Sequence, residues 1–178
     1  MRQGITMGKL KIFVSALLIS LVSAVSASAN VVSFQIIQHD PGQEKVRASS
    51  YVIESRLFDF FFEKGIVITN SPTAVSSSGE KDEELYYEAL SEASSGFCNY
   101  FISITIDYKT QNSTNPDALI LSNIEKINWK VFDLKTGKSV ASGSRIAKEV
   151  KSNKDNEKGI SEFTVQVAQD IYGSLKKL

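Results

Sequence analysis

The sequence predicts an α/β fold of the α+β type: a two-layer sandwich in which three helices lie mainly on one face of a mixed sheet of about five strands. Two observations support it. In the first half of the chain, segments with helical spacing of apolar residues alternate with short β-branched runs, which is typical of parallel strands joined by crossover helices. In the second half, a turn signal between two further β-branched runs predicts an antiparallel hairpin.

The first strand and the first helix follow each other directly. Residues 31–38 form a short β-branched run that ends at the turn-forming residues 39–42, so we expect a strand there. From residue 44 to residue 64 the apolar spacing becomes helical, and Gly65 is suited to cap the C-terminus of that helix. The apolar stripe of the predicted helix consists of Val46, Ile53, Leu57, Phe60 and Phe61.

A second strand and a second helix come next, separated by a polar segment. Residues 66–69 predict the strand, and residues 71–79 are expected to be a mobile loop that is too polar to pack. Helical spacing returns at about residues 81–95, and Gly96 ends that helix. Its apolar side consists of Leu85, Tyr86, Ala89, Leu90 and Ala93.

The later strands are predicted from alternation and from a turn. Apolar residues alternate along residues 99–109, so one face of this strand should be buried and the other mostly solvated. Residues 118–121 are a candidate short edge strand. Residues 127–134 form the next strand, and a turn at 135–138 joins it to a strand at 139–150, which makes these two antiparallel neighbours.

The chain closes with a helix at about residues 156–175, where two terminal lysines suit the negative end of the helix dipole. The predicted order is therefore β-α-β-α-β-(β)-β-β-α, with parallel strands first and an antiparallel hairpin after them. The apolar stripe of this last helix consists of Ile160, Phe163, Val167, Ala168, Ile171 and Leu175.

Residues 1–29 have the order of a secretory signal peptide: basic residues, then an apolar run at 12–22, then small residues. Ala27 and Ala29 provide the small side chains that signal peptidase needs, so we place the cleavage after Ala29 and the start of the mature chain at Asn30. The apolar run is shorter than the roughly 20 residues that span a bilayer. We therefore expect a periplasmic protein, exported through a cleaved signal peptide.

Composition narrows the class of the mature protein. Removing residues 1–29 from the 178 leaves 149, enough for one domain, which we place at residues 30–178. Three of the 20 Lys and Arg are removed against none of the 20 Asp and Glu, so the net charge becomes about −3 and nucleic acid is an improbable partner. Asn30 stands where bacterial lipoproteins carry a cysteine, so no covalent lipid anchor is expected.

The sequence contains no catalytic signature, metal motif or cofactor motif. His39 is the only histidine, which excludes a multi-histidine zinc site. Cys98 is the only cysteine, so we expect a buried free thiol and leave an intermolecular disulfide open. A Cys98–His39 nucleophile pair is the remaining catalytic arrangement, and both residues are better explained as a structural thiol and a turn residue. The acidic residues of the second helix are interpreted as a solvated face. We expect a non-enzyme without cofactors.

The best candidate for a binding surface is a second stripe on the first helix. At 100° per residue, Tyr51, Phe58 and Phe62 fall close together on the side opposite the stripe predicted to be buried. A helix on a sheet needs one apolar face, so the second must be covered by a neighbouring helix of the same domain, by the loop 71–79, or by another protein. The sequence leaves these alternatives open, including a homodimer.

Two segments carry a resemblance to known proteins. The first helix ends at residues 61–65 directly before the strand at 66–68, and residues 131–138 form a hairpin in which Asp133 to Gly137 read Asp-x-x-Thr-Gly. With the order of elements, these resemble the amino-terminal domain of TolB, the penicillin-binding-protein activator lipoproteins and the periplasmic part of the curli-secretion lipoprotein. The resemblance implies a protein-binding or assembly module of the cell envelope. A carrier or sensor of a small apolar or lipidic ligand is the alternative.

Overall fold

The computed structural model describes residues 30–109, 113–148 and 150–178; the predicted signal peptide lies outside these residues. Two short 3₁₀ turns, Leu121–Asn123 and Ser152–Lys154, accompany the regular elements. The helices and strands are β1 (Val31–His39), α2 (Ala48–Glu63), β2 (Val67–Asn70), β3 (Ala74–Ser76), α3 (Gly79–Ser95), β4 (Tyr100–Tyr108), β5 (Ile124–Asp133), β6 (Lys138–Ile146) and α4 (Glu157–Leu175).

The described strands form one mixed sheet in the order β2-β1-β4-β5-β6, and β3 continues the β2 edge along β1. Strand β1 runs parallel to β2, β3 and β4, whereas β5 and β6 are antiparallel additions. The connection from β1 through α2 leads to β2 on one side of β1. The connection through α3 leads to β4 on the other side of β1. Because right-handed crossovers in opposite directions lie on opposite faces, α2 and α3 are on opposite faces of the sheet.

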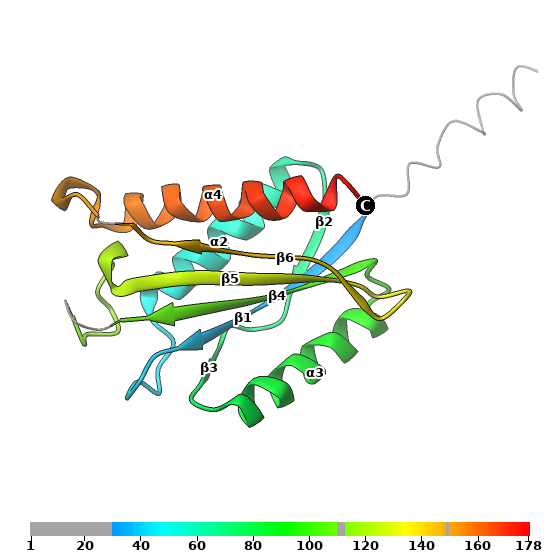
Figure 1. The fold of residues 1–178 in the computed structure, drawn as a ribbon, viewed down its shortest axis with the longest axis horizontal. Helices are drawn as coiled ribbons and strands as arrows, with labels where there is room; N and C mark the ends of the chain where they lie inside the picture. The colour runs from blue at the N-terminus through cyan, green and yellow to red at the C-terminus, as the bar shows by residue number, and fades with distance from the viewer. Residues whose placement is uncertain (1–29, 110–112, 149) are drawn as a thin grey trace, which may run out of the picture.

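The predicted α/β sandwich with three helices is therefore confirmed, with six strands among the described residues. Helices α2 and α4 pack against each other on one face, which we call the closed face (Figure 1). Of the described helices, only α3 lies on the other face, which we call the open face. The buried stripes of α2 and α4 are those predicted from the spacing, apart from Val46.

The closed face holds the main core, and it is built from alternate residues of the strands. Strand β4 contributes three isoleucines, Ile102, Ile104 and Ile106, which are fully buried. The open face has a smaller apolar cluster in which Ala89 and Ala93 of α3 cover Phe101. On the same face of β4 as Phe101, Ser103 and Thr105 stay partly exposed. The alternation expected for residues 99–109 is confirmed.

Helix α2 begins at Ala48 and not at residue 44, so Val46 is outside the helix. The reason is Arg47, whose backbone is extended and whose N–H donates to the side-chain oxygen of Gln38 at 2.8 Å. The Arg47 guanidinium is buried in an ion pair with Asp40. A charged pair between the end of β1 and the residue before α2 thus delays the start of the helix.

The prediction that residues 71–79 form a loop too polar to pack is wrong. Residues 74–76 form β3, and the side chains of Ser71, Thr73 and Ser76 are buried. The Ser71 N–H donates to the carbonyl of Phe34 at 3.0 Å. Backbone pairing with β1 orders this segment, and small hydroxyl side chains fit there without apolar bulk.

Two other boundaries differ from the expectation. Residues 118–121 are not a strand, and a 3₁₀ turn begins at Leu121. The hairpin is confirmed, although its strands are β5 (Ile124–Asp133) and β6 (Lys138–Ile146). Its turn places Gly137 at φ +68°, a backbone conformation that glycine adopts without strain. The Asp133 carboxylate accepts from the N–H groups of Lys135 and Thr136 at 2.8 and 3.0 Å.

Candidate functional site

The predicted aromatic stripe of α2 lies on the surface of the described protein. Tyr51 is 52% exposed, Phe58 37% and Phe62 71%. On the opposite side of the helix, Ile53 and Leu57 are completely buried. One side of α2 therefore completes the core, while the aromatic side remains open to solvent.

The other residues singled out in the sequence lie apart from this stripe. Ala27 and Ala29 are outside the described residues, and Asn30 is exposed just before β1. Cys98 is half-buried, near the start of β4, and its Sγ lies 3.9 Å from the Thr69 hydroxyl. His39 ends β1 and pairs in register with Asp107, near the far end of β4. The nine-residue strand separates the two, so no Cys98–His39 pair exists.

His39 is not only a turn residue, as the sequence suggested, but the centre of a polar cluster. Its Nδ1 lies 2.9 Å from an Asp107 oxygen on β4, and its Nε2 lies 3.0 Å from an Asp82 oxygen on α3. Carboxylates only accept, so both bonds form when the imidazole carries both of its protons. Asn128 donates to the other Asp107 oxygen at 3.0 Å. The cluster ties the first turn of α3 to the ends of β1 and β4.

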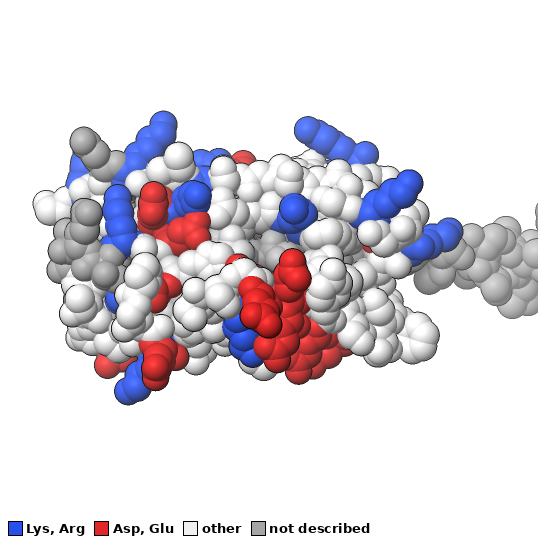
Figure 2. All heavy atoms as spheres, turned by 60° about the horizontal axis from the view of Figure 1, so that its bottom comes forward, with Lys and Arg blue, Asp and Glu red and all other residues white. Residues whose placement is uncertain are grey.

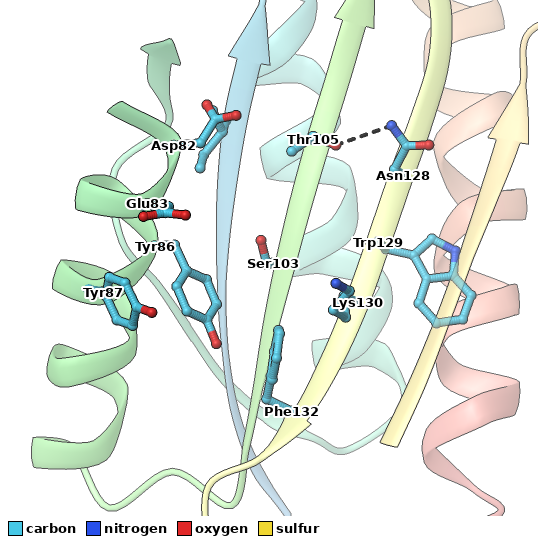
Figure 3. Close-up of a pocket in the computed structure, with 11 residues that line it drawn as sticks. Asp82, Glu83, Tyr86, Tyr87, Ser103, Thr105, Asn128, Trp129, Lys130 and Phe132 are labelled. Atoms are coloured by element: carbon cyan, nitrogen blue, oxygen red, sulfur yellow. Dashed lines mark hydrogen bonds between the residues drawn. The ribbon is translucent and has the colours of Figure 1, made fainter. Parts of the chain in front are cut away.

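Beside this cluster, a groove of about 490 Å³ runs between α3 and the open face of the sheet (Figure 3). Its helix wall presents Asp82, Glu83, Tyr86 and Tyr87. The floor mixes apolar and polar side chains and closes on an aromatic ring at one end. The floor side chains are Ile37 from β1, Ser103 and Thr105 from β4, and Asn128, Trp129, Lys130 and Phe132 from β5.

Two tyrosines and two carboxylates, Asp82 and Glu83, line the helix side of the groove, and more carboxylates lie on α3 outside it. Burial raises the pKa of Tyr86 above its ordinary value of 10.0, and the adjacent Tyr87 raises it further. Tyr87 is 62% exposed and accessible at the rim. Acidic side chains gather over α3, where Figure 2 shows them as a continuous red area. The exposed carboxylates of α3 are Glu80, Glu83, Glu84, Glu88 and Glu92.

Within residues 30–109, 113–148 and 150–178, no group of three or more His, Cys, Asp and Glu side chains is arranged to hold a metal ion. No helix in the same part of the chain is long and apolar enough to cross a membrane. The groove offers hydroxyl and amide groups for hydrogen bonding next to the aromatic rings of Tyr86, Tyr87 and Phe132, which suits binding.

The fold and these surfaces define an α/β sandwich domain with two exposed features, the aromatic stripe of α2 and the groove beside α3. Residues 31–176 match the model of a family described as "Uncharacterised protein", and the chain belongs to that family. No curated protein matches it.

Several solved structures are similar to this chain at low identity. A PelC dodecamer from Paraburkholderia phytofirmans is 14% identical over 82% of this chain and 87% of its own, with a TM-score of 0.46. Lipoprotein GNA1162 from Neisseria meningitidis is 16% identical over 83% of this chain and 99% of its own, with a TM-score of 0.46. TolB from Acinetobacter baumannii is 11% identical over 84% of this chain and 29% of its own, with a TM-score of 0.44. TolB is thus among the similar structures, as the sequence led us to expect.

The sequence missed the groove and the His39 cluster because both depend on the face that α3 covers. The alternation in residues 99–109 did indicate that Ser103, Thr105 and Asp107 share a solvated face. Neither α3 nor β5 could be placed beside that face from spacing alone, since the spacing does not say on which face a helix packs or which strands become neighbours.

Proposed function

We propose that this chain is an exported cell-envelope protein that acts without catalysis, by binding another protein through the aromatic stripe of α2. The observation that supports this most is the exposure of Tyr51, Phe58 and Phe62 in a helix whose other side is fully packed. A folded domain gains nothing from three solvated aromatic rings in one line, whereas protein interfaces favour such residues.

The geometry of the stripe suits a protein partner. The three residues are seven and four positions apart, so they follow one line along the helix over about 16 Å. Charged side chains flank the line, because Asp59 and Glu63 are also exposed. An aromatic centre with a polar rim is the usual composition of a binding surface whose energy comes from a few residues.

A double substitution tests the role of the stripe. Tyr51→Ser with Phe58→Ser should leave the far-UV circular dichroism and the melting temperature close to those of the wild type, because both side chains are exposed. The same variant should lose the partner that the wild type retains after crosslinking in its host. Phe97→Ser with Val67→Ser is the matched control, since it removes two exposed apolar groups outside both the stripe and the groove. A stripe variant that unfolds, or that keeps the partner, contradicts the proposal.

Export is tested separately by osmotic-shock fractionation of the host. The proposal expects the protein to be released in soluble form, with an N-terminus at Asn30 when the product is sequenced. Recovery only in detergent, or a mature chain that still begins at Met1, would count against an exported protein without a lipid anchor.

The alternative function, a carrier of a small apolar or lipidic ligand, is less well supported by the groove. A hollow of suitable size lies between α3 and the sheet, but its lining is mixed, because Ser103, Thr105 and Asn128 place polar groups beside the apolar side chains of Ile37 and Phe132. Apolar ligands prefer an apolar lining. Native mass spectrometry of protein purified from its host distinguishes the two, because a retained small molecule favours the carrier and a stoichiometric protein favours the binding module.

A further inference from the structure

The groove beside α3 lies over the middle of the sheet, and much of its floor consists of residue pairs from two neighbouring strands. Thr105 of β4 pairs in register with Asn128 of β5. Two residues along, Ser103 pairs with Lys130, and two further along β5 the floor closes on Phe132. Because each strand residue adds about 3.4 Å, this part of the floor extends over about 14 Å. A chain-like ligand, such as a short oligomer, can therefore lie along it.

On this floor a ligand meets side chains and not free backbone groups. Strand β4 lies between β1 and β5, and β5 lies between β4 and β6, so neighbouring strands use the backbone N–H and C=O groups of both. A peptide that binds by adding a strand needs a free sheet edge, which neither of these two strands has. Recognition in the groove therefore depends on the hydroxyl, amide, charged and aromatic groups of side chains.

Several polar groups in and beside the middle of the groove have unused capacity for hydrogen bonds. Ser103, Glu83 and Lys130 make no side-chain hydrogen bond or ion pair within the described part of the chain. Gln35, the register partner of Ser103 on β1, is 5% exposed, and its Oε1 has no donor among the described residues. A buried acceptor without a donor is uncommon. Donors and acceptors thus stand close together, which suits hydroxyl groups because a hydroxyl both donates and accepts.

Next to these polar groups, three rings form what we call the aromatic surface: Tyr86 and Tyr87 of α3 with Phe132 of β5. The ring centroid of Tyr86 is 5.2 Å from that of Tyr87 and 5.2 Å from that of Phe132. A sugar ring carries C–H groups on its faces and hydroxyls around its rim, so it can stack on an aromatic side chain while its hydroxyls form hydrogen bonds. An aliphatic ligand would leave the neighbouring polar groups unpaired. A saccharide matches both parts of the groove.

The charges of the groove favour a neutral ligand. Glu83 on the helix wall and Lys130 on the floor have opposite signs, so a cation or an anion meets one like charge. The exposed carboxylates along α3 add repulsion of anions (Figure 2). A neutral saccharide avoids both penalties and still bonds to the two charged side chains through its hydroxyls.

We propose that the groove binds a neutral oligosaccharide, with sugar rings against the aromatic surface and hydroxyl groups bonded to Ser103, Glu83 and Lys130. The observation that carries this is the adjacency of unpaired polar groups and aromatic rings along one groove of about 490 Å³. The site is separate from the stripe on α2, so it does not depend on a protein partner there.

Nuclear magnetic resonance titration of the isotope-labelled protein, purified from its host, tests the site. The three neutral probes are cellotetraose, maltotetraose and tetra-N-acetylchitotetraose. At least one of them should shift the amide resonances of residues 103–105 and 128–132, with a dissociation constant on the order of 1 mM. Tetragalacturonate, which is anionic, should bind about tenfold more weakly than the best neutral probe.

Two substitutions at Tyr87 separate stacking from hydrogen bonding. Tyr87→Ala removes the ring at the rim and should weaken binding of the best probe about tenfold, whereas Tyr87→Phe keeps the ring and should change the affinity by less than about threefold. Phe97→Ala is the matched control, because it removes an exposed ring outside the groove, and it should bind like the wild type. Tyr87 and Phe97 are both exposed, so the variants should keep the fold, which circular dichroism checks.

Glu83→Gln tests the charge of the helix wall. The amide still bonds to hydroxyls, so the best neutral probe should bind within about threefold of the wild type. Tetragalacturonate should bind more tightly to this variant than to the wild type, because a repulsive charge has been removed. An unchanged affinity for tetragalacturonate contradicts the role given to Glu83.

Other results overturn the proposal as a whole. It is wrong if no neutral probe shifts the groove residues at about 20 mM, or if Tyr87→Ala binds the best probe like the wild type. Tetralysine is the remaining comparison. If it binds in the groove more tightly than every neutral probe, the groove belongs to a cationic peptide and not to a saccharide.

Discussion

The two faces of the sheet are built from the same strands and have opposite properties. On the closed face, α2 and α4 cover Ile102, Ile104 and Ile106 completely. On the open face, the residues between them, Ser103 and Thr105, form the floor of a groove that α3 covers only in part. The comparison teaches that strand parity decides which residues are buried: a shift of one residue along β4 moves from the core to a partly exposed groove.

The largest effect is expected at the polar edge of the closed face. Asp40→Asn keeps the shape of the side chain and leaves the fully buried Arg47 charge without its partner, so the free energy of unfolding should fall by about 3–5 kcal/mol. The surface pair of Arg56 and Glu63, 3.7 Å apart, provides the control. Glu63→Gln should cost less than about 1 kcal/mol. Urea unfolding measures both, and equal losses would show that burial does not distinguish the two pairs.

Adjacent substitutions on β4 compare the faces directly. Ile104→Ala removes a fully buried side chain and should cost about 2–5 kcal/mol. Thr105→Ala, one residue further, removes a hydroxyl that accepts from Asn128 at 3.2 Å on the open face and should cost less than about 1 kcal/mol. The difference in urea midpoint between the variants measures the asymmetry. Comparable losses would mean that the open face also carries core energy.

Gly143 connects the closed face to the edge of the sheet. Gly143→Ala places a methyl group where Cζ2 of Trp129 would be 2.5 Å away, so the indole must move. Overpacking of this kind costs about 1–3 kcal/mol. Ser142→Ala on the neighbouring, exposed position is the control and should be nearly neutral. Thermal unfolding followed by Trp129 fluorescence records both the stability and the displaced ring, and an unshifted emission spectrum would contradict the packing.

The smallest effect concerns pH. Burial raises the pKa of Tyr108 above its ordinary value of 10.0, although hydrogen bonds from Ser49 and Ser50 and the charge of Arg47 oppose the rise. The folded state therefore keeps the phenol proton to higher pH than the unfolded state does. Stability from this group is complete below pH 10 and is lost as pH rises above that value.

Tyr108→Phe isolates this contribution. The variant should lose about 1 kcal/mol at pH 7, because the hydroxyl is 2.8 Å and 2.9 Å from the hydroxyls of Ser49 and Ser50. Its stability should also fall less steeply than that of the wild type between about pH 9 and pH 11. Urea unfolding across that range checks the slope, and parallel curves for the two proteins would exclude Tyr108 as the source.

Much of the fold could be predicted from local patterns. The helical stripes of α2 and α4, the alternation in β4 and the turn before β6 each depend on residues close together in the sequence, where periodicity reports directly on which side is buried. The aromatic stripe of α2, which begins at Tyr51, could be predicted for the same reason. The prediction failed at β3, because a polar segment can be ordered by backbone pairing that side-chain periodicity does not record.

By itself, the sequence determined the three helices, the strands other than β3, the parity of β4, the aromatic stripe of α2 and a segment at 1–29 with the features of a signal peptide. The tertiary structure alone decided which face α3 covers, since that depends on the strand order β2-β1-β4. It also decided that His39 meets Asp107, 68 residues away, and Asp82, 43 residues away. The physical reason is that contacts between distant residues are set when the sheet assembles, and no local pattern encodes which strand becomes the free edge.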